Sequence, residues 1–312
     1  MEPSTYPDFD DLPKVEGQPQ GCAWGVFDKD GKKDVFGTLN FLTPKVVAAA
    51  GAEVKDGVSI SLKYISTTPY IPSPSCTSHT NPPLSWPLNG LKIPIPGRKP
   101  PIHTPLTLRS LGMEVEGWDE ELTLNTQFST QWDSLCHMTP NGVTYNNARP
   151  TQSALEAQSS ADNALPTIEH WHARGGLVGR GVLIDFKRYW EDTKGEGSYH
   201  ALDGYRITPE DVEAVARHQE VEFQHGDILI IRTGYTEILE RPTAEDMAKF
   251  GNMSLSGMDG TRETARWVWN KRFAAVAGDA HAFEALPVLR EDGSVGEVKD
   301  VGEYSLFRGE GW

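Results

Sequence analysis

The residues best suited to chemistry lie in one short polar segment, QFSTQWDSLCH, at residues 127–137. Within it, Gln127, Gln131, Asp133 and His137 are spaced at i, i+4, i+6 and i+10. An imidazole oriented by a nearby carboxylate can take up and release a proton near neutral pH, and both groups can also bind a metal ion. The segment therefore predicts an acid–base pair or part of a metal site, although the Asp–His spacing alone also fits a structural pair.

Imidazole and indole side chains elsewhere could contribute to a binding pocket. His170 and His172 flank Trp171 at a strand-like spacing, which would place both imidazoles on one face. They could then bind a metal together, or make structural hydrogen bonds before the glycine-rich turn that follows. Trp24 and Trp132 could stack on an aromatic substrate or pack in the core.

Two carboxylates follow the last apolar segment of the chain. Asp279 ends the stretch FAAVAGD, and Glu284 comes shortly after it. Because carboxylates at the ends of buried strands often belong to functional sites, Glu284 is a candidate substrate-binding residue. Cys136, next to His137, allows a nucleophile as a further alternative.

Three apolar runs predict the strands that would position these residues. They are GVLID at 181–185, DILIIRTG at 227–234 and FAAVAGD at 273–279. Each is short, rich in aliphatic residues and bounded by glycine or polar residues, which is typical of buried strands.

Helices are predicted from their N-terminal signals. Thr43 can cap a helix that begins at PKVVAAA, and Thr208 can cap one that begins at Pro209, with Asp211 completing a capping box. The stretch TRETARWVWNKR at 261–272 has the pattern of a third, amphipathic helix. Strands separated by helices indicate a mixed α/β architecture.

Composition shifts divide the chain into a central domain and three atypical segments. We expect one domain over residues 19–290, preceded by a disordered segment at 1–18. Residues 63–83 are rich in Pro, Ser and Thr and lack apolar periodicity, which predicts an inserted loop. Residues 291–312 are rich in Gly and acidic side chains and predict a loosely ordered tail. The inserted loop and the tail could be translated intron sequence or genuine lineage-specific protein.

Charge and composition narrow the class of partner. The net charge is −15 and the chain has no basic stripe, so nucleic acid is not an expected partner. It has no apolar run long enough for a membrane span, no signal-peptide pattern, and only three scattered cysteines. We therefore expect a cytoplasmic protein with a small-molecule substrate, no membrane partner and no organic cofactor, and a homodimer is an open alternative for its assembly.

The segment at 127–137 resembles the motif H-x-G-T-H-x-D-x-P-x-H of the cyclase family, metal-dependent hydrolases that include bacterial kynurenine formamidases. Thr130, Asp133 and His137 match the motif, whereas Gln127 and Gln131 stand where the family has histidine. Further stretches resemble a fungal-type branch of the family in which Gln replaces these histidines. They are PQGCAWGVFDKDGKKDVFGTLNFLTP, HWHARGGLVGRGVLID, HGDILIIRTGY and FAAVAGDAHAFEALP, and with the motif segment they span most of residues 19–287.

The resemblance implies a fold and an activity. The implied fold is α/β, the swivelling β/β/α arrangement with a mixed, partly barrel-like sheet and outer helices. The implied activity is hydrolysis of a small-molecule amide, typified by the arylformamidase reaction of tryptophan catabolism, which converts N-formylkynurenine to kynurenine and formate. A zinc or manganese ion would activate the water in such an enzyme, with Asp133 as the remaining ligand and His137 in proton transfer. The implied substrate-binding residues are Gln127, Gln131, Trp132, Trp24, His170, His172 and Glu284.

Two departures from the family pattern leave other functions open. An amide oxygen is a poorer zinc ligand than imidazole, and the helical segment that brings a further His and Glu to the family's metals has no counterpart after residue 290. The chain could instead be a metal-independent lactone hydrolase, dehydratase or cyclase of secondary metabolism. Asp133 and His137 would then do the acid–base chemistry, and the two glutamines would donate hydrogen bonds to a carbonyl. A catalytically inactive protein that binds a small ligand is the third alternative.

Overall fold

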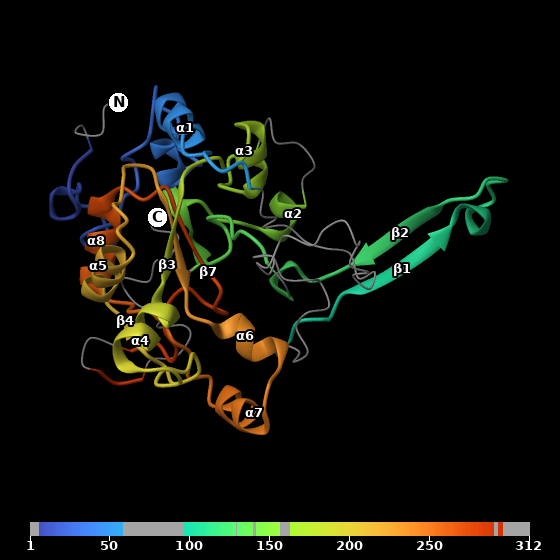
Figure 1. Ribbon diagram of the computed structural model, residues 1–312. Helices are drawn as coiled ribbons and strands as arrows, with labels where there is room; N and C mark the ends of the chain where they lie inside the picture. The colour runs from blue at the N-terminus through green and yellow to red at the C-terminus, as the bar shows by residue number, and fades with distance from the viewer. Residues whose placement is uncertain are drawn as a thin grey trace. The chain divides into compact units, whose positions relative to one another are not determined.

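The computed structural model describes residues 6–58, 97–128, 130–139, 142–156, 163–289 and 293–295. The chain forms two compact units (Figure 1). The first comprises Met1–Lys55, Asp133–Ile238 and Thr243–Trp312, and the second comprises Asp56–Trp132 and Leu239–Pro242. Residues 19–290, expected to form one domain, are therefore divided between two units.

A three-stranded parallel sheet forms the centre of the first unit (Figure 1). Its strands are β3 (Gly181–Asp185), β5 (Ile228–Arg232) and β7 (Ala275–Gly278), in the order β3-β5-β7. Parallel strands covered on both faces are apolar along most of their length, and the central strand β5 follows this rule. All three strands predicted from apolar runs are confirmed.

The other strands of the described chain form two small separate sheets. In the first unit β4 (Arg206–Ile207) pairs in parallel with β6 (Gly257–Met258), and in the second unit β1 (Ile102–Thr107) pairs with β2 (Trp118–Thr123). The described strands thus make sheets of three, two and two strands, none closed on itself. The mixed α/β class is confirmed, but the partly barrel-like sheet expected from the resemblance is not supported.

The predicted helices of the first unit begin where their capping residues stand. They are α1 (Pro44–Gly51), α5 (Pro209–His218) and α8 (Arg262–Lys271). The Thr208 hydroxyl accepts a hydrogen bond from the Asp211 amide at 3.2 Å, and the Asp211 carboxylate accepts one from the Thr208 amide at 3.0 Å. This reciprocal pair satisfies two amides that a helix start leaves without partners, and it confirms the predicted capping box.

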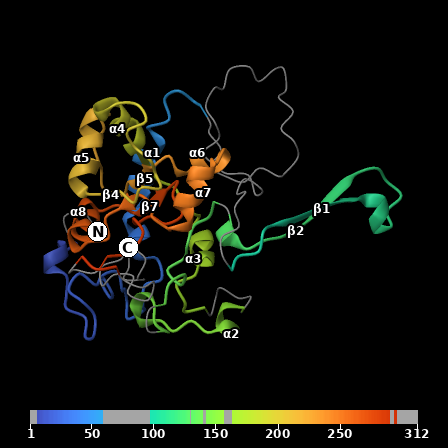
Figure 2. The same ribbon diagram turned by 90° about the horizontal axis from the view of Figure 1, so that it is seen from below.

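Further helices complete the two units. The α-helices are α2 (Gln152–Leu155), α3 (Ile168–Ala173), α4 (Phe186–Lys194), α6 (Tyr235–Glu240) and α7 (Ala244–Gly251). Short 3₁₀ helices lie at Phe9–Asp11, Gly37–Phe41, Leu108–Leu111, Thr126–Phe128 and Tyr145–Asn147. Both views show α5 beside α4 and α8, in agreement with their contacts (Figures 1 and 2). None of the helices in the described part of the chain has the length and apolar character needed to cross a membrane.

The N-terminal segment packs against α8. Phe9 and Leu12 are buried in the core, and the Phe9 amide donates a hydrogen bond to the Asn270 side chain at 2.9 Å. The Arg272 guanidinium, at the end of α8, donates to the Asp8 carboxylate at 2.8 Å. The burial of Phe9 and Leu12 and these hydrogen bonds together hold the N-terminal segment against α8.

This packing differs from the disordered segment expected over residues 1–18, of which residues 1–5 lie outside the described chain. The acidic, proline-containing composition suggested disorder because so few apolar side chains are present. Phe9 and Leu12 nevertheless suffice, because α8 presents a complementary apolar face and basic side chains that pair with the acidic ones, such as Arg266 with Asp10 at 2.8 Å.

The hairpin β1–β2 is the main element of the second unit, and its sequence does not predict it. Ile102 lies opposite Thr123 and Thr107 lies opposite Trp118, in a regular antiparallel register. Every residue of β2 is exposed, so neither face shows the alternation that marks a half-buried strand.

Two other predicted segments fall largely outside the described residues. The expected inserted loop at 63–83 lies entirely outside them. Of the expected tail at 291–312 only residues 293–295 are described, and there Val295 forms an isolated antiparallel bridge with Leu289.

We predict that Phe9→Ala destabilises the protein by about 3–5 kcal/mol, since truncating a buried phenylalanine loses apolar contacts and leaves a cavity. The measurement is urea unfolding followed by tryptophan fluorescence. Lys14→Ala, at an exposed position of the same segment, is the matched control and should leave the unfolding midpoint unchanged. Equal midpoints for the two variants would contradict the packing of the N-terminal segment on α8.

Candidate active site

Asp133 and His137 of the first unit lie together on one turn. The Asp133 Oδ1 atom is 3.7 Å from His137 Nδ1, and both side chains are about one-third exposed, at 28% and 34%. The distance fits an ion pair rather than a direct hydrogen bond. Because Nδ1 faces the carboxylate, proton transfer with a substrate would fall to Nε2. The turn thus offers a solvent-accessible imidazole beside a carboxylate, which is an arrangement suited to general acid–base chemistry.

Local hydrogen bonds shape this turn. The His137 amide donates to the Ser134 carbonyl at 2.9 Å, and the Cys136 amide donates to the Ser134 hydroxyl at 3.2 Å. Serine side chains commonly close such turns by accepting a hydrogen bond from an amide two residues on. Ser134 therefore brings the two ends of the Asp133–His137 segment toward each other.

Cys136 is poorly suited to act as a nucleophile. Burial raises the pKa of its thiol to about 11, so the thiolate is scarce at neutral pH. Since the thiolate is the reactive form, this environment disfavours the nucleophile alternative.

The predicted residues Gln127, Gln131 and Trp132 belong to the second unit. Gln127 lies in the 3₁₀ helix Thr126–Phe128, where its carbonyl accepts a hydrogen bond from Arg98 at 3.3 Å. Gln127 and Gln131 are half-buried, and Trp132 is exposed. Their participation in one site with the acid–base pair remains a prediction.

His170 and His172 lie on a helix rather than a strand. Both belong to α3, where successive residues are rotated by about 100°, so side chains two apart point in nearly opposite directions. His170 is half-buried, with its ring 6.2 Å from that of Phe36, whereas His172 is exposed. The interpretation of this segment as a strand is therefore wrong, and helix geometry directs the two imidazoles away from each other.

The signals for this helix were present but short. Thr167 precedes α3 as its N-cap residue, and Gly175 and Gly176 follow it with φ of 104° and 87°. Glycine with positive φ commonly follows the end of a helix. The six-residue helix between these signals is too short for a recognisable apolar period.

Trp24 is half-buried in a loop of the first unit. It follows the buried Ala23 and precedes Gly25, whose amide donates a hydrogen bond to the Asn146 side chain at 2.8 Å. Its backbone is thus held by this bond, and the stacking of its indole on a substrate remains a prediction.

Glu284 is buried, with 7% of its surface exposed, and lies beside β6 through a bridge with Met258. A Cβ atom on Gly257 would lie 2.7 Å from the Glu284 carbonyl carbon, so only glycine allows this close approach. Asp279, in contrast, has a structural role, because its carboxylate accepts hydrogen bonds from the amides of Thr233 and Gly234 at 2.6 and 2.8 Å. A role for Glu284 in substrate binding remains a prediction.

The structure adds three residues that the sequence did not single out. Thr144, which is fully buried, donates a hydrogen bond from its hydroxyl to the carbonyl of Leu135, inside the Asp133–His137 turn. Tyr145 and Asn146 follow it and are also buried. The available signal was the Asn146–Asn147 pair, because asparagine tolerates the left-handed conformation that both residues adopt, with φ of 55° and 58°.

Within the described residues, the donor set does not fit the zinc or manganese site that the family resemblance implies. Among the described residues, no group of three or more His, Cys, Asp or Glu side chains is arranged to hold a metal ion. Asp133 supplies one carboxylate, and the amides of Gln127 and Gln131 are weak ligands for zinc.

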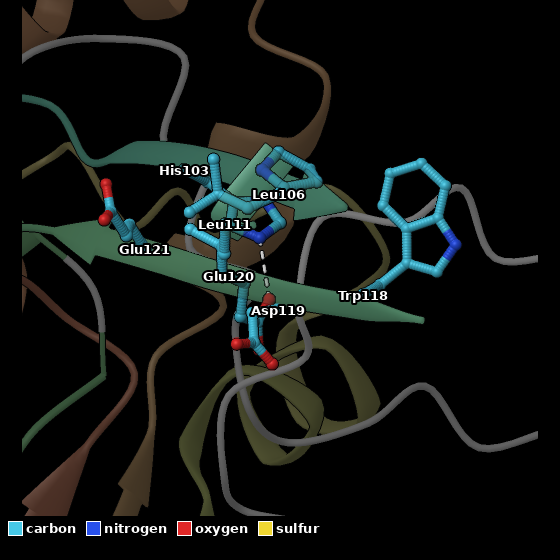
Figure 3. Close-up of a pocket in the computed structure, with 8 residues that line it drawn as sticks. His103, Leu106, Leu111, Trp118, Asp119, Glu120 and Glu121 are labelled. Carbon is cyan, nitrogen blue, oxygen red and sulfur yellow. Dashed lines mark hydrogen bonds and ion pairs between the residues drawn. The ribbon is translucent and has the colours of Figure 1, made fainter. Parts of the chain in front are cut away.

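An open depression of about 870 Å³ lies on the hairpin of the second unit (Figure 3). Figure 3 shows His103 and Glu120 joined across it, with 2.7 Å between Nε2 and Oε2. Its lining residues are His103, Pro105, Leu106, Leu111, Trp118, Asp119, Glu120 and Glu121. No sequence-predicted site residue is among them, so this depression does not identify the candidate active site.

Comparisons with known proteins support one family. The model of a family described as "Putative cyclase" matches residues 58–285 of this chain. A solved crystal structure described as that of a novel cyclase is similar, with 27% sequence identity and a TM-score of 0.60. The similarity covers 81% of this chain and 76% of that one. No functionally curated protein matches the chain.

We predict that this protein binds zinc weakly or not at all, because the motif that it resembles has histidine ligands where this chain has the amides of Gln127 and Gln131. The protein is produced in cells grown in zinc-supplemented medium and purified, and its metal content is measured by mass spectrometry. The Asp133→Asn variant is the matched control. We expect well under one zinc per chain, and the same amount in the variant. A stoichiometric zinc ion that survives gel filtration would contradict the prediction, and Glu284 would then be the first replacement ligand to test.

Proposed function

The chain belongs to the cyclase family, and from this premise we propose that it is an enzyme that acts on a small molecule by acid–base chemistry, with hydrolysis of an amide as its reaction. The observation that carries the proposal is the pairing of the Asp133 carboxylate with the His137 imidazole at 3.7 Å on one solvent-accessible turn. An arylformamide such as N-formylkynurenine is the first substrate to test.

The proposed reaction needs one proton acceptor and one carbonyl-binding group. His137 takes a proton from water while the water oxygen forms a bond to the carbonyl carbon, and Asp133 stabilises the imidazolium that results. The same imidazolium then gives its proton to the leaving nitrogen as the carbon–nitrogen bond breaks, which yields a carboxylic acid and an amine. The carbonyl oxygen, where negative charge develops, also needs a hydrogen-bond donor, and this role for Gln127 and Gln131 of the second unit stays a prediction from the sequence.

The two glutamines favour a second candidate function as well. A site that relies on hydrogen bonds and one imidazole could equally hydrolyse a lactone, or catalyse a dehydration or a cyclisation, because each needs proton transfer next to a polarised carbonyl. In each of these reactions Asp133 and His137 would keep the same acid–base role. A protein that binds a small ligand without turnover is the non-enzymatic alternative.

A screen of small amides, lactones and pooled metabolites with purified protein separates these candidates. It is run before and after exhaustive chelation, with products detected by mass spectrometry. Amide cleavage that survives chelation supports the proposal, and turnover of another class supports the second candidate. Amide cleavage that chelation abolishes would overturn the metal-independent chemistry. Binding without turnover would identify the ligand-binding alternative.

We predict that His137→Ala lowers kcat by about 10²–10⁴-fold, the usual contribution of a general acid–base group, while the fold is preserved. His218→Ala is the matched control, since this histidine is exposed on α5 and should leave kcat unchanged. The measurement is steady-state kinetics on the substrate found in the screen, with circular dichroism to verify folding. Unchanged turnover in His137→Ala would show that the acid–base assignment is wrong.

A further inference from the structure

The local hydrogen bonds of the Asp133–His137 turn leave its placement in the protein unexplained. Ser134 accepts both the amide of His137 and the amide of Cys136, so these bonds join residues of the same turn. They define the shape of the turn and not its position. A contact with another part of the chain must supply the position.

Thr144 provides such a contact. Its hydroxyl donates to the carbonyl of Leu135, which lies midway between Asp133 and His137 in the sequence. Thr144 is 0% exposed, and its own amide donates to the Ala148 carbonyl at 2.9 Å. The donor is therefore held in the interior, with its backbone fixed.

The residues after Thr144 anchor it to a distant loop. The Tyr145 hydroxyl donates to the Asp34 carboxylate at 3.1 Å, and the Asn146 side-chain amide donates to the Asp28 carboxylate at 2.9 Å. The Lys33 ammonium group also donates to the Asn146 carbonyl at 2.6 Å. These bonds hold the two residues that follow Thr144 in the chain, so a shift of Thr144 would disturb several of them.

We propose that Thr144 is a positioning residue that, through the Leu135 carbonyl, holds the His137 imidazole beside the Asp133 carboxylate. Thr144 acts on the chemistry only through the turn. The proposal rests on the proposed function for the role of His137, but the geometry it predicts can be measured independently of any substrate.

The test compares Thr144→Val with Thr144→Ser. Valine keeps the shape and the buried methyl group but removes the hydroxyl donor, whereas serine keeps the hydroxyl and loses the methyl group. The imidazole signals of ¹³C-histidine-labelled protein are recorded by NMR at one fixed pH, and the His137 signal is assigned from its loss in His137→Gln. We expect the chemical shift of His137 to move in Thr144→Val, because the ring leaves its place beside Asp133, and to follow the wild type in Thr144→Ser. On an active substrate, kcat should fall by up to about 100-fold in Thr144→Val, with a smaller change in KM, because misplacing a catalytic group has effects of this size.

Each outcome decides a separate point. A folded Thr144→Val with a wild-type His137 chemical shift would overturn the positioning role. A changed chemical shift, in a protein that turns over no substrate, would support positioning and count against the proposed function alone. If Thr144→Val does not fold, Thr144→Cys replaces it, because a thiol is a weaker donor of similar size. An intermediate change of the His137 chemical shift in that variant supports the proposal, and no change overturns it.

Discussion

The carboxylate of Asp34 joins two segments of the first unit on which the position of the candidate site depends. It accepts hydrogen bonds from the amides of Phe36 and Gly37 at 2.9 and 2.6 Å, from the Asn40 side chain at 2.8 Å and from the Tyr145 hydroxyl at 3.1 Å. Burial, reinforced by the negative charge of Asp34, raises the pKa of Tyr145 far above its ordinary value, so the phenol remains a donor at any physiological pH. One carboxylate side chain therefore closes its own loop and joins it to a segment more than a hundred residues away.

The elements predicted correctly are those whose formation depends on residues close together in the sequence. The capping box of Thr208 and Asp211 lies within four consecutive residues, and β5 is a continuous apolar run. The hairpin could not be predicted in this way, because Pro105 interrupts β1 and the acidic residues of β2 are exposed on both faces. The N-terminal segment illustrates a related limit: Phe9 becomes a core residue only because α8 meets it 261 residues further along the chain.

The same difference between local and long-range information decides which parts of the candidate site could be predicted. Asp133 and His137 could be paired from sequence, because four residues of a turn bring them close. The relative directions of His170 and His172 could not be predicted, because the sequence did not show whether the segment is a strand or a short helix. Side chains two residues apart share a face in a strand but not in a helix, and this segment is a helix. The bond from Thr144 to the Leu135 carbonyl involves a backbone acceptor, which carries no sequence signature at all.

Gln127 and Gln131, which stand at the histidine positions of the motif that the segment resembles, change what the proposed site requires. A primary amide can donate and accept hydrogen bonds, but it is neither protonated nor deprotonated near neutral pH and so cannot replace imidazole as an acid or base. In the proposed reaction the proton chemistry is therefore concentrated on His137, and the polarisation of the carbonyl depends on hydrogen bonds, which weaken steeply with poor angle or distance. Such a site needs positional accuracy above all. In our proposal a turn shaped by Ser134 and fixed through Thr144 to the Asp34 loop meets that need, and a buried threonine with no acid–base chemistry of its own contributes by position.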